Sequence, residues 1–247
     1  VAMNREGYEV AVMDADITGP SIPKMFGING RAKGTQEGIL PAESKGGIEI
    51  MSVNLQKGQK VDLTKGNTGL KTILVGLGWD EAPRKFSLFS KHEDIDCDAS
   101  ALLISAQTGK LNGPVDVGYF GNLTHQTGAV HHMGDNLTGA GDGDDEQILV
   151  ELPKLGNAYS KIVFVVNIYQ AMQRKQHFGM IKNAFIRLVD AEKGVELCRY
   201  NLSENYDGKT AMIFGEIYLY NGEWKFNAIG EPTNDNGISE LAARYQR

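Results

Sequence analysis

The feature that most constrains the fold is a series of short apolar or alternating runs, each bounded by turn residues. Runs of this kind are typical of β-strands, and many of them at short spacing predict an antiparallel β-sandwich. The dipeptide Asn221-Gly222 between the last two runs predicts a tight hairpin. The runs are Thr72–Leu77, Ile95–Ile104, Val115–Phe120, Gln147–Leu152, Ile162–Ile168, Ala184–Val189, Val195–Leu202, Ala211–Tyr220 and Trp224–Ile229.

Two further stretches have helical patterns. Tyr169–His177 predicts one helix, and Ile238–Gln246 predicts an amphipathic helix that closes the domain. We expect Trp79 and Trp224 to lie in the core. The mainly β region therefore extends over residues 55–247, with a few short helices.

Composition narrows the class of protein. The chain carries 25 basic and 31 acidic residues, a net charge of -6, which argues against a nucleic-acid-binding surface and favours cations or basic partners. Its two cysteines, Cys97 and Cys198, form no CxxC motif, so we expect them to be buried and inert. No apolar run is long enough to span a membrane and no signal peptide is found, which predicts a cytoplasmic setting. The first residue, Val1, is not a methionine, as though the chain were cut from something longer.

Residues 1–54 have an α/β pattern. The end of a helix at residues 1–6 precedes a buried parallel strand at Tyr8–Met13. Asp14 and Asp16 follow the strand, at the edge of the sheet where α/β proteins bind ligands, and could hold Mg²⁺ or orient a water. The alternative is an aspartate that caps a helix.

This part resembles a known family. Asp14-Ala15-Asp16-Ile17-Thr18-Gly19-Pro20-Ser21-Ile22-Pro23, Ile39-Leu40-Pro41 and Gly46-Gly47-Ile48-Glu49-Ile50-Met51-Ser52 are similar to the Mrp branch of MinD/ParA-type P-loop ATPases. The resemblance implies ATP binding and iron–sulfur cluster transfer. No Gly-rich phosphate loop and no cluster-binding cysteine pair occurs in the 247 residues, however. We interpret residues 1–54 as a truncated fragment unable to hydrolyse ATP alone.

An acidic stretch, residues 134–146, contains five carboxylates, four glycines and no basic residue. Carboxylates this dense repel one another unless a cation or water separates them, and calcium prefers their oxygens together with backbone carbonyls. Asp135 to Glu146 has the length of an EF-hand loop, but Leu137 and Gly139 stand where side-chain oxygens are required. The stretch is therefore not an EF-hand, and a solvated acidic loop is the alternative to a calcium site.

Residues 55–247 resemble the TerD family of tellurium-resistance and stress-response proteins. The motifs that carry the resemblance are Leu55-Gln56-Lys57-Gly58, Ile73-Leu74-Val75-Gly76-Leu77-Gly78-Trp79-Asp80, Ile95-Asp96-Cys97-Asp98-Ala99-Ser100-Ala101, the acidic stretch, Lys161-Ile162-Val163-Phe164-Val165-Val166, Asn183-Ala184-Phe185-Ile186-Arg187 and Ala211-Met212-Ile213-Phe214-Gly215-Glu216. This resemblance implies a calcium-binding β-sandwich without enzymatic activity. It also implies a role as scaffold or sensor alongside other Ter proteins, at the inner membrane surface.

The expected calcium ligands come from the acidic stretch and from neighbouring strand ends. Strand alternation places Asp96 and Asp98 on one face of their strand and Ile95 and Cys97 on the other. So many acids indicate two ions rather than one, while Asp142 is expected to face solvent. The predicted ligand set is Asp80, Asp96, Asp98, Asp135, Asn136, Asp144, Asp145 and Glu146, with carbonyls around Gly139, Gly141 and Gly143.

Other readings stay open. His125, His131 and His132 suggest a transition metal, but adjacent residues of a strand face opposite ways, so we expect surface histidines. The basic residues before His177 could meet an acidic partner, or form a solvated helix face. The rival function is an ATP-dependent iron–sulfur carrier, with its phosphate loop supplied from elsewhere. A third reading is that residues 1–54 are a gene-prediction artefact.

Overall fold

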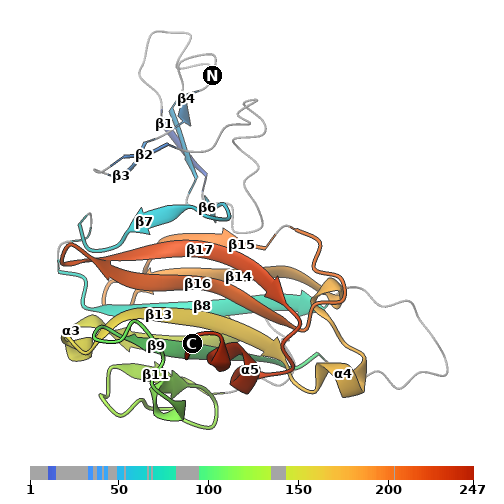
Figure 1. Ribbon diagram of the computed structural model, residues 1–247. Coiled ribbons are helices and arrows are strands. Elements are labelled where there is room, and N and C mark those ends of the chain that lie inside the picture. Colours follow the sequence, from blue (N-terminus) through green and yellow to red (C-terminus); the bar gives the residue numbers. More distant parts are fainter. Residues whose placement is uncertain are drawn as a thin grey trace.

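The computed structural model describes residues 55–65, 67, 69–80, 95–134, 143–202 and 204–247. It also describes the backbone of residue 81 and of the strands before residue 55. Most of the described chain forms two six-stranded sheets, which Figure 1 shows packed one behind the other.

We call the first the β9 sheet. Its strand order is β10-β9-β13-β16-β17-β7, and all its neighbouring strands are antiparallel. The strands are β7 (Lys60–Asp62), β9 (Cys97–Ser105), β10 (Val117–Gly118), β13 (Tyr159–Ile168), β16 (Ala211–Tyr220) and β17 (Glu223–Thr233).

The second, the β8 sheet, has the order β11-β12-β8-β14-β15-β6. It is antiparallel apart from the parallel pair of β15 and β6. The strands are β6 (Asn54–Leu55), β8 (Thr72–Glu81), β11 (Val130–His132), β12 (Glu146–Glu151), β14 (Ile181–Asp190) and β15 (Val195–Asn201).

The main core lies between the sheets. Alternating side chains such as Ile73, Val75 and Leu77 of β8 join Phe164 and Phe214 of the β9 sheet in one buried cluster. Because a pleated strand turns alternate side chains to opposite faces, the period-two pattern of the sequence suffices to build such a layer. The predicted β-sandwich is therefore confirmed.

A second, smaller core covers the outer face of the β9 sheet. Leu102, Val163 and Ile213 pack there against Leu241 of α5 (Ile238–Ala243), which lies in front of the sheet in Figure 1. Strand β9 is consequently buried on both faces along its whole length.

The predicted strands agree with the structure. Each run contains or overlaps a strand, and Asn221 and Gly222 have the positive φ angles, 53° and 80°, of a type I′ hairpin. Both predicted helices are shorter than expected. The helix α4 (Ala171–Arg174) is limited by the left-handed residues Gln170 and Lys175. Trp79 and Trp224 lie in the main core as expected.

Several short elements have no counterpart in the prediction. Strands β6, β7 and β11 are only two or three residues long, so their alternation is too short to recognise. The same applies to α3 (Leu152–Leu155) and to the 3-10 turns η1 (Pro114–Asp116) and η2 (Phe178–Met180).

Before residue 54 the structure describes backbone only. Strand β1 (Ala11–Asp14) pairs in parallel with β5 (Glu49–Ser52), as expected of an α/β fragment, and β4 (Ala42–Glu43) adds an antiparallel partner. Strands β2 (Lys33–Thr35) and β3 (Gly38–Leu40) form a hairpin. The helix end predicted at residues 1–6, and Asp16, lie outside the described residues. The domain boundary at residue 54 stays a prediction.

Candidate acidic metal site

The predicted calcium ligands divide into described and undescribed residues. Asp135, Asn136, Gly139 and Gly141, like Asp142, lie outside the described residues. The structure places Gly143, Asp144, Asp145 and Glu146 at the entrance to β12, Asp80 near the end of β8, and Asp96 and Asp98 at the start of β9.

The end of the acidic stretch is fastened along β8. The Asp145 amide donates to the Leu77 carbonyl at 2.8 Å, and the Trp79 amide donates to Oδ2 of Asp145 at 2.7 Å. Burial raises the pKa of the Asp145 carboxyl, and the nearby charges of Asp80 and Asp144 raise it further. A raised carboxyl pKa identifies a place where negative charge is costly and where a cation would be favoured.

Asp144 turns to the outer face of the β8 sheet. Its carboxylate accepts from Nε of Arg187 at 2.7 Å and from the second terminal nitrogen at 2.9 Å, and its side chain is fully buried. A Cβ on Gly76 would lie 2.3 Å from this carboxylate. Gly76 therefore leaves the space that the Asp144 carboxylate occupies, and Arg187 holds the carboxylate there. Neither the role of Gly76 nor that of Arg187 was predicted from the sequence.

Glu146 turns inward and joins the two sheets. Its Oε2 accepts from the Ala99 amide of β9 at 2.8 Å and lies 3.2 Å from Nε2 of His132, while this nitrogen lies 3.1 Å from the Ala99 carbonyl. Strand β10 pairs with β9 only at residues 101 and 102. The two side chains therefore satisfy the Ala99 peptide where β10 does not reach.

His132 has a defined tautomer in this arrangement. Its Nδ1 accepts from the Gly134 amide at 3.3 Å, which leaves the proton on Nε2, directed at Ala99 and Glu146. Both His132 and Glu146 are buried.

Asp96 and Asp98 follow the predicted alternation. Ile95, Cys97 and Ala99 belong to the main core, whereas Asp98 lines a groove on the outer face of the β9 sheet. There Oδ2 of Asp98 accepts from Nδ2 of Asn167 on β13 at 3.1 Å.

Cys97 lies close to several of the acidic side chains. Burial raises the pKa of its thiol well above the usual range, and so do the charges of four nearby carboxylates. Burial and Glu196 likewise raise the pKa of Cys198, so both cysteines are buried, protonated thiols, as expected. The four carboxylates near Cys97 are Asp98, Asp96, Glu146 and Asp145.

The described acidic residues of the predicted ligand set therefore lie at one end of the sandwich, but their side chains lie on different faces of the two sheets. Asp80 is exposed and accepts from Asn183 at 2.7 Å, Glu146 is buried between the sheets, and Asp98 faces outward from the β9 sheet. Within the described ranges, no three acidic, histidine or cysteine side chains are placed as ligands of one ion.

The expectation of three surface histidines is wrong for two of them. His132 and His125 are buried, with 4% and 1% of their surface exposed. His131 is half-buried, with Nε2 3.0 Å from the Gly128 carbonyl and 3.4 Å from Glu151. His131 and His132 do face different ways, as the strand pattern predicts.

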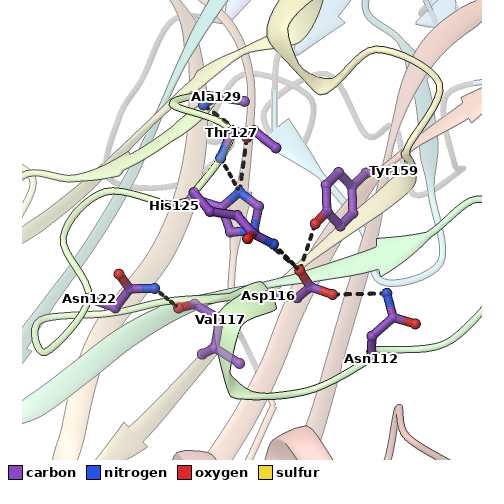
Figure 2. A network of polar contacts seen from close by, with 9 residues as sticks. Asn112, Asp116, Val117, Asn122, His125, Thr127, Ala129 and Tyr159 are labelled. Carbon is purple, nitrogen blue, oxygen red and sulfur yellow. Dashed lines mark hydrogen bonds and ion pairs between the residues drawn. The ribbon is translucent and has the colours of Figure 1, made fainter.

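His125 belongs to a buried network around Asp116 (Figure 2). The Tyr159 hydroxyl donates to Oδ1 of Asp116 at 2.6 Å, and Nε2 of His125 lies 3.4 Å from the same oxygen. Nδ2 of Asn112 donates to Oδ2 at 3.1 Å, and Nδ1 of His125 accepts from the Thr127 amide. Burial and the hydrogen bond to Asp116 raise the pKa of Tyr159 to about 12. The network fastens the segment 112–129 to the first residue of β13.

Comparison with known proteins decides the family. The sequence model of the TerD domain matches residues 51–245, most of the chain. The chain belongs to the TerD family. A second model, described as NUBPL iron-transfer P-loop NTPase, matches residues 1–73 and agrees with the resemblance stated for the N-terminal part.

Several curated TerD-family relatives are similar over the same region. Stress response protein SCP2 of Bacillus subtilis is 50% identical over 200 residues, which cover 79% of this chain and 100% of the relative. Tellurium resistance protein TerD of Serratia marcescens is 45% identical over 195 residues, covering 79% and 97% of the two chains.

Solved structures share the fold. A TerD homologue from Streptomyces coelicolor aligns with a TM-score of 0.53 at 22% identity, over 70% of this chain and 96% of that one. A protein of unknown function, SAV2460, aligns with a TM-score of 0.58 at 23% identity, over 73% and 99%. The β-sandwich is thus the TerD fold.

Proposed function

We propose that this TerD-family chain is a calcium-binding, non-enzymatic scaffold or sensor in tellurite resistance and general stress response. The names of its relatives, a stress response protein and a tellurium resistance protein, support a role in these two processes. The observation that carries the calcium proposal is the fastening of Asp145 to β8, beside Asp80 and Asp144, where burial and like charge raise its pKa.

The donors fit a hard cation. Every side chain of the predicted ligand set offers oxygen, as calcium prefers. Asp80 and Asp145 would supply carboxylates from the described residues, and Asp135, Asn136 and the glycine carbonyls would supply the rest. Asp144, held by Arg187, would keep the end of the acidic stretch in place.

Two ions remain the proposed number. Asp96 and Asp98 face away from the region between the sheets, so the second ion would use these two acids rather than Asp80 and Asp145. Bound calcium would supply positive charge, allowing the carboxylates to lie close together.

Calcium would act by ordering the acidic stretch. Binding to the folded state alone adds about 2.7 kcal/mol of stability when the ion is at 100 times its Kd. The ordered surface would then present a contact for other Ter proteins at the inner membrane surface. Among the described residues no helix is long and apolar enough to cross a membrane, and the cytoplasmic setting belongs to the same proposal.

Calorimetric titration of calcium into metal-stripped protein tests this function. We expect micromolar or tighter binding, with a raised melting temperature. Asp145→Asn is expected to weaken binding at least tenfold, and Glu192→Gln is the matched control. Glu192 lies in the turn after β14, and the register of Asp190 with Ile73 places that turn at the other end of β8 from Asp80. No heat and no stabilisation at millimolar calcium would overturn the proposal.

A second candidate rests on the match of residues 1–73 to an iron-transfer NTPase. The 247 residues contain no phosphate-loop motif, so ATP binding would need a loop from outside them. Nucleotide titration of this chain and of a version extended upstream distinguishes the two: binding by the extended chain alone would support the carrier.

A further inference from the structure

A groove of about 420 Å³ lies on the outer face of the β9 sheet, and we call it the β9 groove. The cross-strand pair Asp98 and Asn167 lies at one end of β9 and β13, with Ser100 two residues along β9. These three side chains line the groove. Other lining residues come from Tyr119 and Phe120 after β10, from residues 169–173 around α4, and from residues 236–240 at the start of α5.

The buried part of the groove offers hydrogen-bond acceptors. Asn167 and Ser100 are 5% and 1% exposed. Nδ2 of Asn167 donates to Asp98, so the amide oxygen Oδ1 is left as an acceptor. Neither this Oδ1 nor the Ser100 hydroxyl has a hydrogen-bond partner among the described residues. Buried polar atoms are nearly always paired, so two orphaned atoms lining one groove point to a ligand that donates hydrogen bonds.

The outer part of the groove is apolar and aromatic. Met172, Phe120 and Tyr169 are 67%, 44% and 40% exposed, a large exposure for such side chains. The guanidinium of Arg174 lies 5.1 Å from the centroid of the Tyr169 ring, within cation–π distance.

The charge of the groove is negative. Among the described residues that line it, Asp98 and Glu240 carry carboxylates and none is a lysine or an arginine. Asn236 donates to the Glu240 carboxylate through its amide and its side chain, whereas the Asp98 carboxylate accepts from Asn167 next to the orphaned atoms. An anion would be repelled there, and a wholly apolar ligand would leave Asn167 and Ser100 unpaired.

We propose that the β9 groove binds the ammonium group of an organic amine. Three N–H donors match three acceptors, namely the Asp98 carboxylate, Oδ1 of Asn167 and the Ser100 hydroxyl. The carbon chain of the amine packs on Phe120 and Met172. A free amine and the lysine side chain of a partner share this chemistry. Either would use the Asp98 carboxylate that the second proposed calcium ion also uses, so the two cations exclude each other there and the test is made without calcium.

The test is a titration of calcium-free protein with 2-phenylethylammonium chloride, followed by NMR chemical shifts. Expected are a Kd on the order of 1 mM, as for a small fragment, and shifts at Asn167 and Ser100. The neutral analogue 2-phenylethanol is expected to bind at least ten times more weakly. Nα-acetyl-lysine amide is the second probe. Tighter binding of this probe than of 2-phenylethylammonium would indicate the lysine side chain of a partner, and weaker binding would indicate a free amine.

Substitutions of residues that line the β9 groove test whether the amine binds there. Asp98→Asn keeps the shape of the side chain and is expected to weaken the amine about tenfold, because a charge-assisted hydrogen bond is lost. Met172→Ala changes an exposed side chain that cannot disturb the core, and a several-fold weakening is expected. Glu192→Gln is the control and should leave the affinity unchanged.

Three results would overturn the proposal. Equal affinity for 2-phenylethylammonium and 2-phenylethanol would show that the positive charge does not contribute to binding. Unchanged affinity in both Asp98→Asn and Met172→Ala would place the amine elsewhere. An absence of amine-induced shifts at both Asn167 and Ser100 would show that the orphaned atoms do not bind the amine. A calcium titration that fails at Asp145 leaves the amine result untouched.

Discussion

Glu146 and His132 form a buried pair, with Oε2 of the carboxylate 3.2 Å from Nε2 of the imidazole. Both also bond to the peptide of Ala99 in the opposite sheet. Side chains of the β8 sheet thereby complete the hydrogen bonding of β9. The last acid of the acidic stretch thus links the two layers of the sandwich, in addition to any part in binding an ion.

Glu146→Gln tests this link. Glutamine can keep an oxygen at the position of Oε2, but it loses the negative charge that strengthens the contacts of this oxygen with the Ala99 amide and with the Nε2 proton of His132. We expect a loss of about 1–3 kcal/mol in the free energy of unfolding, measured with urea in the presence of a chelator. Glu151→Gln, at the half-exposed end of the same strand, is the control and should cost less than about 0.5 kcal/mol. Equal costs would contradict the link.

Gly76→Ala tests the space under Asp144. The new Cβ would lie 2.3 Å from a carboxylate that Arg187 holds by two hydrogen bonds, so the Asp144 side chain must shift and we expect these bonds to be weakened. We expect a loss of about 1–3 kcal/mol, measured by urea unfolding. Gly113→Ala is the control, since a Cβ there meets nothing within 4 Å. A Gly76→Ala variant as stable as that control would show that Asp144 adapts freely.

Arg187→Ala leaves the buried Asp144 carboxylate without its main partner. We expect the free energy of unfolding to fall by about 1–3 kcal/mol. Arg187→Lys should recover only part of it, because an ammonium cannot make the paired bonds of a guanidinium. The control is Lys57→Ala, which breaks an exposed pair with Glu204 and should cost less than about 1 kcal/mol. Full recovery by lysine would contradict a bidentate role.

Tyr159→Phe tests the Asp116 network through alkaline pH. The pKa of Tyr159 is raised in the folded state, to about 12 from 10.0, so the folded protein favours the protonated phenol. Its contribution is complete below pH 10 and is lost as pH rises toward 12. We expect the stability difference between wild type and Tyr159→Phe to shrink across that interval, measured by urea unfolding at each pH. A constant difference would contradict the raised pKa.

The sequence by itself determined the strands of the sandwich. Alternation of period two marks a pleated strand locally, and it correctly placed Cys97 inward and Asp98 outward. The Asn221-Gly222 turn is equally local, because the two residues tolerate the positive φ angles that the hairpin requires. The family motifs of residues 55–247 added the fold, which the comparisons confirmed.

Only the tertiary structure decided the partners of the buried polar groups. Asp144 and Arg187 are 43 residues apart, as are Asp116 and Tyr159, and Glu146 lies 47 residues from Ala99. No local pattern connects such positions, since the packing of two sheets brings them together. For the same reason the burial of His125 and His132 was not predicted, because it depends on the carboxylates of Asp116 and Glu146 that the fold brings to them. The register of the sheets, and not the composition of any segment, therefore placed the acids on separate faces of one end of the sandwich.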